Sequence, residues 1–167
     1  SKATIQSIRT ESLNQLISQG VVPVVAGFQG VDAQENITTL GRGGSDTTAV
    51  AIAAALKNEI CEIYTDVPAV FTADPRLVPA AQPLKNVFFD EMMEMATLGY
   101  KVLHARSVEL ASKFNVKIHL RSTFEKKEGT WVIPQGDAME KPVVTAVTHD
   151  PNTSIFKLFP TPDQPEF

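Results

Sequence analysis

Apolar and polar residues follow two different periods along the chain. Short apolar runs rich in β-branched residues predict strands, and we expect them at residues 21–26, 60–65, 116–121 and 130–133. Apolar positions at helical spacing predict helices at residues 10–20, 47–57, 90–96 and 107–114, with Thr10 and Asp90 as N-caps. Strands that alternate with helices favour an α/β fold, a mostly parallel sheet flanked by helices.

The segments between these elements predict loops and a second unit. Residues 66–83 contain Pro68, Pro75, Pro79 and Pro83, which indicates an irregular surface loop. A short strand is expected near residues 37–40, and two more at 143–147 and 155–159. We therefore predict a first unit over residues 1–135, a linker over 136–142 and a separate β tail over 143–167.

Composition narrows the class of protein. The chain has 167 residues, a net charge of −4, and 43% hydrophobic and 20% charged residues, which suits one ordinary globular domain. The charge provides no basic surface for nucleic acid, and no apolar run approaches the roughly 20 residues of a membrane helix. Cys61 is the only cysteine, so an intramolecular disulfide is excluded and a reducing, cytoplasmic location is expected.

A glycine-rich turn stands directly before the second predicted helix. Its glycines let the backbone approach a ligand, and the free N–H groups of the helix start favour an anionic group. Arg42 offers a planar fork for a carboxylate, and Asp46 adds the opposite charge, so the pair suits a zwitterion. The alternative is a plain turn capped by Ser45 or Asp46. The spacing fits neither the Walker nor the dinucleotide pattern.

Two further segments contain candidate ligand-binding residues. Thr65 and Asp66 end a predicted parallel strand, where ligands of α/β sheets gather, and Phe71, Asp74 and Arg76 follow them. Turn formation by Asp74 and a core position for Phe71 are the alternatives.

The segment of residues 99–104 contains Lys101 between a helix-ending glycine and an apolar pair, where it can meet a phosphoryl group. A solvated surface lysine is the alternative, and we expect His104 to be structural. Glu91 and Glu94 are expected on a solvated helix face.

In this order the three motifs resemble the aspartate kinases, within the wider amino-acid kinase family, over nearly the whole chain. Residues 24–30 resemble the family's substrate-side strand and loop, and residues 38–46 its aspartate-binding loop. Residues 64–76 and 99–104 resemble its nucleotide-binding segments.

The resemblance implies transfer of the γ-phosphoryl group of ATP to the side-chain carboxylate of L-aspartate. The product, 4-phospho-L-aspartate, leads to lysine, threonine and methionine. It also implies that Mg²⁺ arrives with the ATP and that the full-length protein is a homodimer. The implied substrate-binding residues are Arg42, Gly43, Gly44, Ser45 and Asp46. The implied ATP-binding residues are Thr65, Asp66, Phe71, Asp74, Arg76 and Lys101, and the implied catalytic residues are Lys101 and Asp46.

Several departures from the family pattern matter. Phe71 stands where the family often has Tyr, Ala69 replaces a common Gly, and Ala105 a common Pro. The family's first strand and its Lys-Phe-Gly-Gly loop do not precede Ser1. We therefore expect residues 1–135 to be the C-terminal part of the catalytic domain, and the chain alone to have little kinase activity. Robust aspartyl-phosphate formation by the purified chain would contradict this.

Residues 143–167 resemble the opening of an ACT regulatory domain, the kind that binds lysine or threonine in these enzymes, with Glu166 in place of a usual Gly. An unfinished sheet leaves an edge unpaired, so we expect this tail to pack on the kinase part or on another copy.

Two other interpretations remain open. The chain could come from another amino-acid kinase, one for acetylglutamate, glutamate or uridylate, which substrate competition would reveal. It could also be a non-catalytic interaction module that keeps a nucleotide-binding fold, and titration with MgATP would then leave its amide spectrum unchanged.

Overall fold

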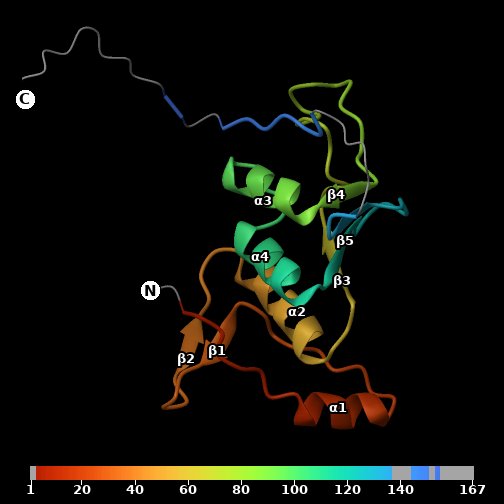
Figure 1. Ribbon diagram of the computed structural model, residues 1–167. Helices are drawn as coiled ribbons and strands as arrows, with labels where there is room; N and C mark the ends of the chain where they lie inside the picture. The colour runs from red at the N-terminus through yellow and green to blue at the C-terminus, as the bar shows by residue number, and fades with distance from the viewer. Residues whose placement is uncertain (1–2, 137–143, 151–152, 155–167) are drawn as a thin grey trace, which may run out of the picture.

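The computed structural model describes residues 3–136, 144–150 and 153–154, and these form a mixed α/β structure (Figure 1). None of the helices in these ranges has the length and apolar character needed to cross a bilayer. The elements in chain order are α1 (Glu11–Ser18), β1 (Gln29–Val31), β2 (Ile37–Thr39), α2 (Gly44–Ala55), β3 (Ile60–Thr65), β4 (Asn86–Phe88), α3 (Phe89–Thr97), α4 (Ala105–Phe114), β5 (Lys117–Ser122) and β6 (Thr130–Ile133).

The main sheet has four strands in the order β3-β5-β6-β4. Strand β3 pairs with β5 in parallel, and β4 pairs with β6 in parallel, which confirms the predicted parallel pairing for two of the three strand pairs. Strands β5 and β6 pair antiparallel because only a short connection, residues 123–129, joins them. Strand β4 was not predicted, since its three residues are too few to show a period. The expected strand near residues 37–40 is β2, which forms a separate antiparallel pair with β1.

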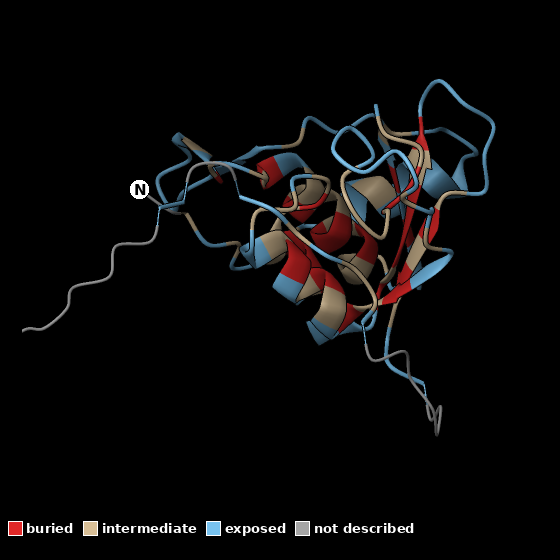
Figure 2. Cartoon of the chain, turned by 90° about the horizontal axis from the view of Figure 1, so that it is seen from above, coloured by how far each residue is buried: buried red, intermediate tan, exposed pale blue. Residues whose placement is uncertain are grey.

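Helices α2, α3 and α4 cover one face of this sheet (Figure 1). Buried residues gather where the helices face the strands, as Figure 2 shows. Both β3 and β6 alternate buried with more exposed residues, which is the pattern of strands covered on one face. The fully buried side chains include Val50, Val70, Val87, Met92, Val108, Ile118, Leu120 and Val132.

Local signals explain where two helices begin and end. Helix α4 begins after the N-cap His104 and ends at Phe114. The C-cap Asn115 follows with φ of 53°, the left-handed conformation that Asn tolerates. The prediction that Asp90 caps helix α3 was wrong. The Glu91 carboxylate accepts the main-chain N–H of Phe88 at 3.0 Å, because Phe88 stands one residue before the helix. Glu91 is thus a capping residue rather than part of a solvated face.

The predicted buried strand at residues 21–26 was wrong. The segment forms no strand, and Val22 and Val24 are 85% and 96% exposed. The same kind of run becomes a strand at Ile60–Thr65 because β5 lies beside it. No strand among the described residues pairs with 21–26, so its β-branched composition alone does not create one. Helix α1, which precedes it and has Thr10 at its N-cap position, also buries no residue.

Residues 144–150 lie against the loop of residues 66–83 and helix α3. The Val147 N–H donates to the Thr72 carbonyl at 2.8 Å, and Thr145 Oγ1 donates to Glu91 Oε1 at 2.7 Å. The strand predicted at 143–147 was wrong for residues 144–147, which the structure describes as irregular. The strand predicted at 155–159, and most of the predicted linker and tail, lie outside the described residues.

Candidate functional site

A cleft of about 470 Å³ opens where the glycine turn meets the loop after α3. Arg42, Gly43 and Asp46 line it from the turn and the start of α2. Tyr100 and Lys101 line it from the loop. The start of α4 and residues Ala96, Gly99 and Asp150 complete the lining. The first and third sequence motifs therefore meet in space.

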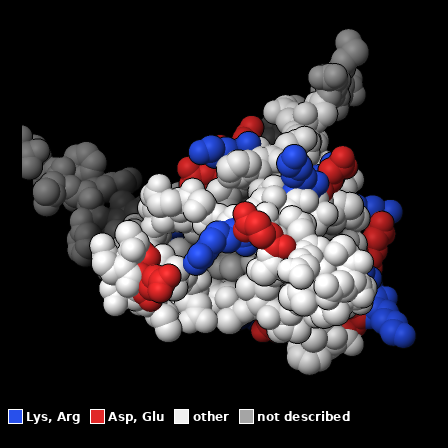
Figure 3. All heavy atoms as spheres, turned by 90° about the horizontal axis from the view of Figure 1, so that it is seen from below, with Lys and Arg blue, Asp and Glu red and all other residues white. Residues whose placement is uncertain are grey.

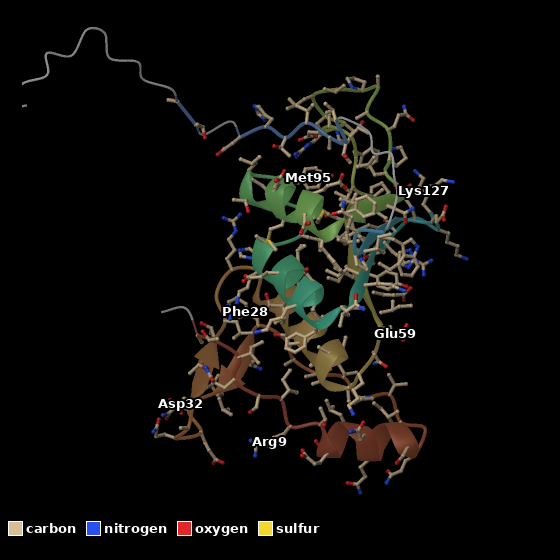
Figure 4. The ribbon with its side chains drawn as sticks, in the orientation of Figure 1. Arg9, Phe28, Asp32, Glu59, Met95 and Lys127 are labelled. Atoms are coloured by element: carbon tan, nitrogen blue, oxygen red, sulfur yellow. The ribbon has the colours of Figure 1, made fainter. Side chains whose placement is uncertain are left out.

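Packing on both sides holds the glycine turn in place. Leu40 is buried, and its N–H donates to the Phe28 carbonyl at 2.8 Å. Figure 4 shows Phe28 between the β1–β2 hairpin and the helices, and a methyl group on Gly44 would press on its ring. Gly43, with φ of 72°, is the N-cap of α2, so this helix starts three residues before the predicted Thr47. The turn thus leads directly into a helix N-terminus that faces the cleft.

The Asp46 carboxylate stands in the first turn of α2 and is half-buried. Burial raises its pKa above the ordinary value of 3.8, because the charged form loses water. A hydrogen bond from the main-chain N–H of His104 and attraction to the His104 ring oppose this shift. Asp46 is therefore a partly desolvated carboxylate whose charge is stabilised from α4.

Lys101 is exposed at the mouth of the cleft, next to two anchored neighbours. Leu103 is buried, and the Tyr100 hydroxyl accepts the main-chain N–H of Phe71 at 3.0 Å. Burial raises the pKa of Tyr100, and the nearby Asp74 carboxylate raises it further. Tyr100 thus connects the cleft to the loop of residues 66–83.

The second motif lies beside this cleft without lining it. Thr65 Oγ1 donates to Asp66 Oδ1 at 3.1 Å, at the end of β3. Arg76 Nη2 pairs with Asp74 Oδ2 at 2.7 Å, and hydrogen bonds from Arg76 lower the pKa of Asp74 to about 2. Phe71 is half-buried and forms a bridge with Pro83 that closes the loop. Thr65 with Asp66 and Asp74 with Arg76 thus form two local pairs, and the hydrogen bond between Phe71 and Tyr100 joins this loop to the cleft.

Two of the predicted substrate residues do not line the cleft. Gly44 is buried under Phe28 and Leu40, and Ser45 is exposed beside Gly27. The sequence reasoning missed Tyr100 and assigned His104 no part in the site, although both line the cleft. Their place beside Lys101 in the third motif was the available signal, but the contacts to Phe71 and Asp46 depend on the fold.

The described residues hold no group of three or more His, Cys, Asp or Glu side chains arranged to bind a metal. A Mg²⁺ bound to nucleotide phosphates needs only one or two protein carboxylates. Asp46 and Asp150 both line the cleft, so its residues fit a magnesium that comes with a nucleotide.

Among the described residues, the other charged and reactive groups lie outside the cleft. Glu62 pairs with Arg121 at 3.1 Å across β3 and β5, and acidic and basic groups are interspersed on the face shown in Figure 3. Cys61 is buried, which raises its pKa to about 11, so it is no nucleophile.

The sequence and the fold of this chain resemble those of known proteins. The model of the amino acid kinase family matches residues 1–122. An aspartokinase from Helicobacter pylori is 46% identical over 167 residues, which is 98% of this chain and 41% of that protein. The chain therefore spans about two fifths of the length of the curated relatives that it matches.

Solved structures show the same likeness. E. coli aspartokinase III in complex with aspartate and ADP superimposes with a TM-score of 0.69 at 38% identity, over 76% of this chain and 28% of that one. Aspartate kinase from Synechocystis superimposes with a TM-score of 0.65 at 53% identity, over 74% of this chain and 21% of that one. The match of the family model, the α/β fold and these structures together show that the chain belongs to the amino acid kinase family.

Proposed function

We propose that the full-length protein carrying this chain is an aspartate kinase, which transfers the γ-phosphoryl group of MgATP to the side-chain carboxylate of L-aspartate. The observation that carries the proposal is the cleft in which Arg42 and Asp46 meet Lys101. The relatives named aspartokinase, and the E. coli structure with aspartate and ADP, support this choice of substrate and nucleotide.

The residues of the cleft suit both the aspartate substrate and the transferring phosphoryl group. Arg42 would bind the α-carboxylate of aspartate, and Asp46 its ammonium group. An oxygen of the side-chain carboxylate would attack the γ-phosphorus, the bond to the β-phosphate oxygen would break, and ADP would leave. Lys101 would offset the charge of the transferring group, since phosphoryl transfer depends on positioning and electrostatics. Magnesium bound to the phosphates would supply further neutralisation.

The loop of residues 65–76 would hold the nucleotide. Thr65 and Asp66 end strand β3, and Phe71 is pinned to Tyr100 at the edge of the cleft. Asp74 and Arg76 would complete this side, although their present ion pair would have to open for Arg76 to meet a phosphate. The 4-phospho-L-aspartate product, the pathways to lysine, threonine and methionine, an ACT domain, a homodimer and a cytoplasmic location stay predictions.

The first test is the reaction of the full-length protein with MgATP and L-aspartate, with the acyl phosphate trapped by hydroxylamine. We expect acyl phosphate with aspartate and none with glutamate or N-acetylglutamate. UMP would form a phosphoanhydride, which hydroxylamine does not trap, so its reaction is followed by ADP release, and we expect none. Equal or faster reaction with one of those acceptors would assign a different kinase, and no ADP release with any of them would favour a non-catalytic module.

Two variants test the assigned roles. Arg42→Ala should raise the KM for aspartate about 30-fold or more, because it leaves a carboxylate without its partner. Lys101→Ala should lower kcat about 100-fold, because it removes charge stabilisation from the transition state. Lys113→Ala, at the exposed end of α4, is the matched control and should change neither constant. Normal kinetics in both cleft variants would contradict the site.

A further inference from the structure

The start of helix α4 contacts the glycine turn at three places. Arg106 Nη1 donates to the Leu40 carbonyl at 3.0 Å, just before the turn. The His104 ring lies against the α-carbon of Gly43, so closely that a methyl group there would overlap it. The main-chain N–H of His104 donates to the Asp46 carboxylate. Two of these three contacts come from one residue.

The N-cap role of His104 fixes its own conformation. Its φ and ψ of −84° and 135° are those of a residue entering a helix, and its Nδ1 accepts the Arg106 N–H at 3.3 Å. Its carbonyl accepts the Ser107 N–H at 2.9 Å and the Ser107 hydroxyl at 2.7 Å. The position of the ring against Gly43 is therefore set by helix α4.

His104 also follows Lys101 by only three residues. Leu103, between them, is buried at 2% exposure, which anchors this short segment to the core. A change in the contact between His104 and Gly43 would therefore alter the place of Lys101 relative to Arg42 and Asp46.

We propose that His104 is a positioning residue. Its ring and main-chain N–H hold Gly43 and Asp46 in their positions relative to Lys101. The inference rests on the proposed phosphoryl transfer, and it adds a role that a helix cap alone does not have. A small misplacement of reacting groups costs about 100-fold in rate, so the ring should matter for kinetics as well as for stability.

Replacement of His104 by Asn separates its role as a helix cap from its role as a positioning residue. Asn can still accept the Arg106 N–H and is among the best N-caps, but it lacks the ring. We expect His104→Asn in the full-length protein to melt close to the wild type. Its kcat/KM for aspartate should fall about 10- to 100-fold. Wild-type kcat and KM in this variant would overturn the proposal, because the cap alone would then suffice.

A double-mutant cycle tests the contact itself. Gly43→Ala places a methyl group into the His104 ring and should lower kcat/KM for aspartate about 100-fold or more. In a His104→Ala background the ring is gone, so the same change should cost about tenfold less. The strain of an alanine at positive φ is present in both backgrounds and cancels. Equal costs in the two backgrounds would overturn the proposal.

The same cycle is read by thermal melting, which needs no substrate. If the full-length protein phosphorylates no acceptor, the proposed function fails, whereas additive melting shifts would reject the His104 contact by themselves. His119→Asn is the control for lost stability. His119 is buried on β5, its Nε2 pairs with the Glu128 carbonyl at 2.7 Å, and it does not line the cleft. This variant should melt earlier and keep its kcat/KM for aspartate, and a fall in kcat/KM similar to that of His104→Asn would count against positioning.

Discussion

Two opposing effects act on the charge of the Asp46 side chain. The site needs its negative charge, yet its half-buried position raises its pKa above 3.8. The folded protein therefore holds this proton more tightly than the unfolded chain does. It follows that the free energy of unfolding contributed by Asp46 falls as pH rises from 3.8 through the raised folded pKa. Above this pH range the charged Asp46 side chain lowers the free energy of unfolding, but it gives the site its negative charge.

Replacing Asp46 by Asn should separate these two effects. At pH 7 Asp46→Asn should have a higher free energy of unfolding than the wild type, because an amide carries no charge to desolvate. The difference should shrink below pH 3.8, where both states of the wild type are protonated. Activity should fall about 100-fold or more, since the ammonium partner is lost.

Urea titrations of both proteins at pH 7 and pH 3 would measure this difference. Asp90→Asn, an exposed carboxylate in the first turn of α3, is the control and should bring no gain. A less stable Asp46→Asn at pH 7 would show that the His104 hydrogen bond outweighs the cost of burial.

Among the elements, the loop of residues 66–83 depends on one hydroxyl for its attachment to the sheet. Thr130 in β6 is fully buried. Its Oγ1 accepts the Val70 N–H at 2.9 Å and donates to the Leu84 carbonyl at 2.6 Å. One side chain thus satisfies main-chain groups at both ends of the loop that we assign to the nucleotide.

Thr130→Val measures how much this attachment contributes to the free energy of unfolding. Valine has nearly the same shape, but it leaves one main-chain donor and one acceptor without partners. We expect the free energy of unfolding to drop by roughly 2 to 4 kcal/mol, measured by urea denaturation. Thr130→Ser keeps the hydroxyl and loses only a methyl group, so it should cost less. If valine and serine cost the same, packing rather than hydrogen bonding holds the loop.

At the scale of the whole molecule, residues 21–26 form a surface segment with exposed apolar side chains. Val22 and Val24 are almost fully exposed in a segment of high β-propensity. Pro23 limits strand pairing here, but the exposed valines on both sides of it form an apolar surface that a second copy can cover. We therefore expect the purified 167-residue chain to associate through it.

Replacing Val22 and Val24 by Lys should reduce this association, because like charges oppose pairing of two copies. Light scattering over time should show slower growth of particles, while circular dichroism should remain unchanged. Gln6→Lys with Ser7→Lys, at exposed polar positions, adds the same charge elsewhere and should protect less. Equal protection by both pairs would assign the effect to net charge instead.

Local patterns predicted most elements because their signals lie within a few residues. Strands β3 and β6 have the predicted bounds, Ile60–Thr65 and Thr130–Ile133. Helix α4 ends at Phe114, as the following Asn115 indicated. The glycine turn was predicted to open a helix at a ligand site, and it does lead into α2 and line the cleft. The cap of α3 was wrongly assigned to Asp90, because Asp90 and Glu91 are both acidic residues near one helix start.

What the sequence by itself determined is the alternation of strands and helices, the bounds of several of these elements, the three motifs and the family, since each of these signals lies in neighbouring residues. Only the tertiary structure decided which segments become strands and which motifs meet. Residues 21–26 and β3 were both predicted as strands from their apolar residues, yet only β3 has a partner strand beside it, and Pro23 interrupts the other segment. Gly43 meets His104, and Phe71 meets Tyr100, through packing of α2, α3 and α4 on one face of the sheet. The physical reason is that hydrogen bonding between strands and contact between side chains depend on distance in space, which spacing along the chain does not specify.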